Sequence, residues 1–161
     1  MRIGNLIFPL LLLAMMNLAA LAHGGEATAS ATQRLPSSEG AMVSFGTLKN
    51  GDVVPPTFTV TFIISGMGVA SAGTNIDNTG HHHLLIDVVD LPDLNQPLPK
   101  SDKIRHFGDG QTEVELTLPE GEHSLQLLFA DYMHRPHDPI VISEKITVTV
   151  SADAVPTGKP E

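Results

Sequence analysis

Alternation of apolar and polar residues with a period of two runs through the middle of this chain. In residues 57–64, 113–118 and 145–150 apolar side chains recur at every second position, mostly with Thr, Glu or Lys between them. This period places successive side chains on opposite faces of an extended strand, so each run predicts a half-buried β-strand. Between residues 41 and 150 almost nothing has the periodicity of a helix, and the pattern therefore predicts an all-β fold.

Seven strands are expected within this region. Their ranges are 42–48, 57–64, 81–90, 103–107, 111–118, 123–131 and 140–150. Clusters of Gly, Asn, Asp and Pro at 49–52, 108–110 and 119–122 mark turns between them. Short strands with frequent turns predict a single antiparallel β-sandwich domain of immunoglobulin-like type over residues 41–150, and a small barrel is the alternative.

The two ends of the chain have a different composition. Residues 1–22 combine one basic residue, an apolar run and a closing Ala20-Leu21-Ala22, which is the layout of a secretory signal peptide. An uncleaved membrane anchor is the alternative, but two asparagines and a proline interrupt the run. Residues 23–40 and 151–161 are small and polar, so we expect a flexible leader and a disordered tail. The expected product is a periplasmic or secreted protein without membrane insertion after cleavage.

Charge and cysteine content exclude several classes of function. The 161 residues carry 18 acidic and 9 basic side chains, a net charge of -9, and the basic residues are scattered, so nucleic acid is not an expected partner. Because the chain has no cysteine, it forms no disulfide and no thiolate metal site. Its serines lack a nucleophile elbow. We therefore expect no catalytic residues and no organic cofactor, with a metal-dependent enzyme as a third alternative.

The eight histidines are unevenly distributed along the expected strands. If successive strands reverse direction, the start of 81–90, the end of 103–107 and the connection 131–139 meet at one end of the sandwich. Six histidines fall at that end, whereas His123 belongs at the opposite end. His23 would head the mature chain, where an amino terminus and an imidazole can chelate copper together. A chance residue in an unstructured tail is the favoured interpretation of His23.

Imidazoles without thiolates favour ions such as Zn(II), Cu(II), Ni(II) or Fe(II). Alternation within 81–90 assigns His82 to the core side, where it would bond to the backbone, and leaves His81 and His83 freer. His134 and His137 are three residues apart, a spacing that can place both on one cation. The candidate metal ligands are His81, His82, His83, His106, Asp131, His134 and His137.

Three segments carry a family resemblance. Residues 65–87, 105–131 and 134–150 contain GHHHLLID, HFGDGQTE, PEGEHSLQL and HRPHDP. In this combination the chain resembles a family of small exported bacterial domains, domain of unknown function 4399. The resemblance implies an exported single domain with seven motif histidines: His81, His82, His83, His106, His123, His134 and His137. Asp109 and the pair Phe129-Ala130 depart from the usual family pattern but leave every histidine in place, and the family implies no activity.

Together these features predict an exported, histidine-rich β-sandwich that binds copper or zinc at one end, for storage, delivery or sensing. The alternative is a non-catalytic immunoglobulin-like module that binds another protein of the cell envelope. In that case the histidines would hold loop conformations by donating to backbone carbonyls. A histidine cluster that responds to acid is a further interpretation of the same residues.

Overall fold

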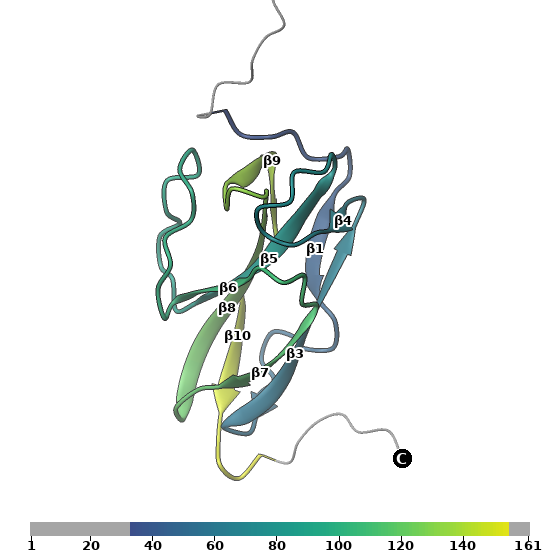
Figure 1. The fold of residues 1–161 in the computed structure, drawn as a ribbon. Coiled ribbons are helices and arrows are strands. Elements are labelled where there is room, and N and C mark those ends of the chain that lie inside the picture. The colour runs from purple at the N-terminus through teal and green to yellow at the C-terminus, as the bar shows by residue number, and fades with distance from the viewer. Residues whose placement is uncertain (1–32, 155–161) are drawn as a thin grey trace, which may run out of the picture.

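Residues 33–154 are described by a computed structural model, and all of their regular structure is β-strand (Figure 1). The strands are β1 (Met42–Phe45), β2 (Val53–Val54), β3 (Thr57–Ser65), β4 (Gly68–Val69), β5 (Thr79–Ile86), β6 (Ile104–Phe107), β7 (Glu113–Thr117), β8 (Gly121–Ala130), β9 (Pro136–Ile142) and β10 (Ile146–Val150). The all-β prediction is confirmed. Within these residues no helix is long and apolar enough to span a membrane.

The strands form two sheets. In the smaller sheet β3 lies between β1 and β7, and both pairings are antiparallel. In the larger sheet β5 and β8 are the central pair; β6 and the short β4 pair with β5, and β9 and β10 pair with successive parts of β8. The short β2 extends this sheet beyond β10. The prediction of a β-sandwich is confirmed, and the two sheets do not close into a barrel.

The main core fills the space between the sheets. On β3 the inward residues Phe58, Val60 and Phe62 are 9%, 0% and 3% exposed, as the period-two pattern predicts. They belong to one buried cluster with Leu127 and Phe129 of β8. Complete burial of such a side chain contributes about 1.5–3 kcal/mol, so this cluster holds the sheets together.

The larger sheet also buries part of its outer face. Leu98, from the long connection between β5 and β6, packs with Leu85, Ile104 and Leu128 on that face. Figure 1 shows this connection running beside the sheet. As a result β5 is buried on both faces from Gly80 to Ile86. Burial on both faces explains why this segment has a continuous apolar run in place of alternation.

The described residues form ten strands where seven were expected, because the short β2 and β4 were not predicted and one expected strand is divided, and several strand boundaries differ from the expected ones. Two of these differences have an identifiable cause. The strand expected over 81–90 ends at Ile86 because Asp87 takes a left-handed backbone conformation, with φ of 53°. The carboxylate of Asp87 then accepts the Ser124 N–H at 2.8 Å. The strand expected over 140–150 is divided into β9 and β10, because the Ser143 hydroxyl oxygen accepts the Leu127 N–H at 2.9 Å and takes the place of a backbone carbonyl.

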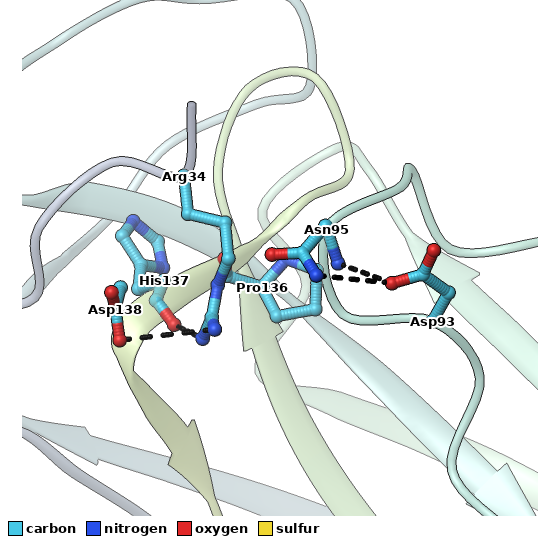
Figure 2. A network of polar contacts seen from close by, with 6 residues as sticks. All are labelled: Arg34, Asp93, Asn95, Pro136, His137 and Asp138. Atoms are coloured by element: carbon cyan, nitrogen blue, oxygen red, sulfur yellow. Dashed lines mark hydrogen bonds and ion pairs between the residues drawn. The ribbon is translucent and has the colours of Figure 1, made fainter. Parts of the chain in front are cut away.

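The N-terminal end of the described chain lies along β9 (Figure 2). The guanidinium of Arg34 donates to the carbonyl oxygens of Pro136, at 3.0 Å, and of His137, and it lies 3.7 Å from the Asp138 carboxylate. Backbone hydrogen bonds between residues 35–37 and Asp138 continue the contact. This stretch is the end of the segment expected to be a flexible leader, and it is bonded to the sandwich.

The remaining expectations for the chain ends lie outside the described residues. These are the signal peptide over 1–22, the first ten residues of the leader including His23, and residues 155–161 of the tail.

Candidate metal centre

The pleat of β5 sends three consecutive histidines to two different faces of the larger sheet. His82 faces inward, with its ring centroid 5.2 Å from that of Phe62 and 5.0 Å from that of Phe129. His81 and His83 face outward, and the three side chains are only 0–2% exposed. The inward position of His82 agrees with the prediction. The expectation that the other two are freer is wrong, because residues from β6 and from the β8–β9 loop cover the outer face as well.

Four imidazole rings meet on that outer face. His83 is the cross-strand partner of His106 on β6, and His134 approaches from the loop between β8 and β9. Ring centroids of the six pairs formed by His81, His83, His106 and His134 lie 4.6–6.0 Å apart. One ring nitrogen from each of His81, His83 and His106 lies within 4.8 Å of the other two. We call these four residues the histidine cluster.

This spacing is that of ligands around one ion. Imidazole nitrogens bind a tetrahedral zinc ion at about 2.0 Å, which places the centroids of four such rings about 5 Å from one another. The shortest centroid distance in the histidine cluster is 4.6 Å, between His106 and His134, and the longest is 6.0 Å, between His83 and His134. The nitrogens that lie within 4.8 Å of one another belong to His81, His83 and His106, and His134 would have to turn a ring nitrogen toward them to complete a tetrahedral set.

Hydrogen bonding gives independent support for a ligand. Both ring nitrogens of His81 and of His83 are buried, with no hydrogen-bond partner anywhere in residues 33–154. A neutral imidazole offers one donor and one acceptor, and each buried group left unpaired costs about 1–3 kcal/mol. A metal ion satisfies one nitrogen of each ring. His82 is buried in the same way within the described chain, so its expected bonds to the backbone are not formed.

Burial keeps the imidazoles of β5 in the neutral form that binds metals. Burial, followed by the neighbouring histidines, lowers the pKa of His81 to about 3 and that of His83 to about 2. Burial lowers the pKa of His82 to about 4. The pKa of His106 is lowered too, first by burial and then by His134. Since a metal ligand must be deprotonated, no proton has to leave these rings at neutral pH.

Asp131 positions the loop that carries His134. Its Oδ1 accepts the N–H groups of Met133 and Arg135 at 2.8 and 2.9 Å, and its backbone carbonyl accepts the His134 N–H at 2.9 Å. His134 itself has a left-handed φ of 66°. The structure therefore uses this predicted ligand as a positioning residue, and its oxygens are not in the group of mutually close ligand atoms.

His137 lies apart from the histidine cluster. Its ring stacks on Phe129 with centroids 6.0 Å apart, and its Nδ1 lies 3.5 Å from the Phe129 carbonyl oxygen. A Cβ placed on Gly80 would come 3.0 Å from the ring, which locates His137 on the inward side of β5. The spacing of three residues thus sends His134 and His137 to opposite faces of the sheet, and the expectation that both hold one cation is not met.

His123 is at the far end of the sandwich, as expected. It bonds to the Asp87 carboxylate at 2.8 Å and to the Pro119 carbonyl oxygen at 3.0 Å. Both of its ring nitrogens therefore have protein partners, which distinguishes it from the histidines of β5.

Gly108 was not among the predicted site residues, although it lets His106 turn toward the other rings. A Cβ at this position would overlap the His106 imidazole and would approach the Ala72 side chain at 3.1 Å. The backbone of Gly108 is outside the left-handed region, so the close approach of the ring is the reason for glycine. The signal was present in the sequence, because this glycine follows His106 by two residues in the motif HFGDG.

The fold and the site together define a β-sandwich with a four-histidine cluster on the outer face of the larger sheet, two of whose members, His81 and His83, are buried. The chain belongs to the family described as domain of unknown function 4399, whose model matches residues 60–151. The resemblance inferred from the motifs is thereby confirmed, and the matched range contains the whole histidine cluster. No curated protein and no solved structure matches the chain.

Proposed function

We propose that this protein binds one transition-metal ion, copper or zinc, through His81, His83, His106 and His134. The observation that carries the proposal is the meeting of four imidazoles at mutual distances of 4.6–6.0 Å, two of them with both nitrogens buried and unpaired within the described chain. Without an ion, burial removes water from the ring nitrogens of His81 and His83 and no hydrogen bond within the described chain replaces it. A bound ion would replace the missing partners.

The chemistry of the ligand set supports copper or zinc and a non-catalytic role. Imidazole nitrogens suit both ions, and the chain has no thiolate to offer. Catalytic zinc sites use three protein ligands and keep a fourth position for water or substrate, whereas four protein ligands close the site. Storage, delivery or sensing of the ion fits such a site. The signal-like segment 1–22 supports placing this role in the periplasm or outside the cell.

The alternative function, an immunoglobulin-like module whose histidines hold loops, has less support. It requires imidazoles bonded to backbone carbonyls. Within residues 33–154 His123 has such a bond at 3.0 Å, and His137 has a long contact of 3.5 Å. In the β8–β9 loop the carboxylate of Asp131 makes the stabilising bonds.

Calorimetric titration of the mature chain with Zn(II) and with Cu(II) tests the proposal. We expect one equivalent of at least one ion to bind with a micromolar or lower Kd. His83→Leu should abolish this binding and still fold, because leucine fills a similar volume in a buried position and removes two unpaired nitrogens. His123→Gln is the matched control, and it should bind the ion as the unmodified chain does. Millimolar or absent binding, or full binding by His83→Leu, would overturn the proposal.

A further inference from the structure

We propose that the histidine cluster works as two halves, a fixed half that retains the ion and an exchanging half through which the ion enters and leaves. The fixed half is His81 and His83, and the exchanging half is His106 and His134. This inference rests on the proposed function. It adds the route by which the ion leaves the site for a competing ligand in solution.

The fixed half belongs to the most completely buried strand of the larger sheet. β5 pairs with β8 over residues 81–86 on one side and with β6 over residues 82–85 on the other. Its two outward histidines are 0% and 2% exposed. His83 lies in both backbone ladders and His81 in the ladder with β8, and neither ring has free space around it, so this half is unsuited to exchange.

The exchanging half belongs to less constrained elements. His106 is an exposed residue in a four-residue strand, and within residues 33–154 this strand has one ladder, the one with β5. His134 is half-buried and stands in a loop with a left-handed backbone conformation. The rings of this half are also the closest pair in the histidine cluster, with centroids 4.6 Å apart. The more exposed side of the site is therefore formed by these two residues.

One turn, residues 71–74, connects the two members of the exchanging half. The Ala72 N–H donates to the carbonyl oxygen of Gly108, two residues after His106, at 2.7 Å. The neighbouring Gly73 N–H donates to the carbonyl oxygen of Tyr132, two residues before His134, at 2.9 Å. A shift of this turn would displace both ligands together, while the fixed half stays in its sheet.

Release kinetics of zinc test the division into halves. The mature chain is loaded with Zn(II) and mixed with an excess of a chromogenic chelator in a stopped-flow instrument, and the Kd is measured separately by competition. We expect His106→Ala and His134→Ala to keep a measurable site, with an affinity about 10-fold weaker that comes from faster release. His83→Leu, in the fixed half, should lose more than about 100-fold in affinity.

The role of the turn has its own matched pair of variants. Gly73 and Gly51 both have left-handed φ values, of 80° and 89°, and a Cβ on either would meet no atom within 4 Å. Alanine therefore strains both backbones equally, but only Gly73 lies in the turn that joins the exchanging half. We expect Gly73→Ala to speed zinc release by about 3-fold or more and Gly51→Ala to leave the rate unchanged.

The outcomes separate this inference from the proposed function. If His106→Ala and His134→Ala lose as much affinity as His83→Leu, the division into halves is overturned and the metal site stands. If Gly73→Ala releases zinc at the rate of Gly51→Ala, the shared turn is overturned. If the unmodified chain binds neither ion, the proposed function and the inference both fail.

Discussion

Three identical side chains in consecutive positions, His81, His82 and His83, have different environments in this protein. The outward pair meets other imidazoles, and the inward one lies between two phenylalanine rings. The only difference between these positions is the face of the strand to which the pleat directs them. On the outer face the neighbouring residues are other histidines, and on the inner face they are phenylalanines. These contacts decide whether an imidazole is a candidate ligand or a core residue.

Gly108 gives the sharpest prediction for a single residue. Gly108→Ala should push the His106 ring out of the histidine cluster, because the new methyl group would occupy its place. The exposed ring can move into solvent, so we expect little loss of stability and a zinc affinity about 10-fold lower in a calorimetric titration. Gly68→Ala is the control, since its Cβ would meet only ordinary contacts, the nearest at 3.4 Å. An unchanged affinity of Gly108→Ala would contradict this account of His106.

At the scale of elements, the segment before β1 and strand β9 stabilise one another. Arg34→Ala removes a charged donor from two backbone carbonyl oxygens, those of Pro136 and His137. We expect the free energy of unfolding to fall by about 1–3 kcal/mol. Hydrogen exchange should show faster exchange of the Asp138 amide, which donates to the Leu35 carbonyl at 2.9 Å. Arg34→Lys keeps the charge but not the forked donor, so it should restore only part of the protection.

An unchanged exchange rate of the Asp138 amide in Arg34→Ala would contradict this role of Arg34. Unchanged exchange at Ser143, whose N–H bonds to Leu127 at 2.9 Å in the same sheet, is the internal reference for that measurement.

The strand boundaries show where the alternating sequence pattern was sufficient to predict a strand. Alternation predicted β3 to within one residue, over 57–64 against Thr57–Ser65, because this strand has one face in the core and the other in solvent. The end of β5 and the break between β9 and β10 were missed. Both depend on one side chain, that of Asp87 or Ser143, bonding to the backbone of β8, which is distant in sequence.

At the scale of the whole molecule, the buried histidines make stability depend on pH. In an unfolded chain a histidine titrates near pH 6.5, whereas in the folded, metal-free protein the pKa values of His81, His82 and His83 are about 3, 4 and 2. Below pH 6.5 the unfolded chain therefore takes up protons that the folded chain does not bind. The stabilisation is complete above pH 6.5 and is lost progressively as the pH falls from 6.5 toward the folded pKa values of about 4, 3 and 2.

The expected slope is about 1.4 kcal/mol per pH unit for each of the three histidines once the pH is well below 6.5. Urea unfolding of the metal-free chain at pH 7.5, 6 and 5 measures it. His82→Leu is the control, because it removes one of these groups without removing a member of the histidine cluster, and it should reduce the slope by about 1.4 kcal/mol per pH unit. Equal stability at pH 7.5 and pH 5 would mean that these rings are protonated in the folded protein.

The pattern along the chain was sufficient to predict the all-β class, the positions of most strands and the gathering of histidines near one end of the sandwich. Those features follow from local rules: the period-two pattern, turn residues, and the reversal of direction between strands. Which histidines meet depends on contacts between residues that are distant in sequence. The tertiary structure placed His134 in the cluster and His137 on the opposite face, made Asp131 a loop anchor, and covered His81 and His83. The physical reason is that the direction of a loop side chain depends on backbone bonds and packing with distant residues, which periodicity along the chain does not encode.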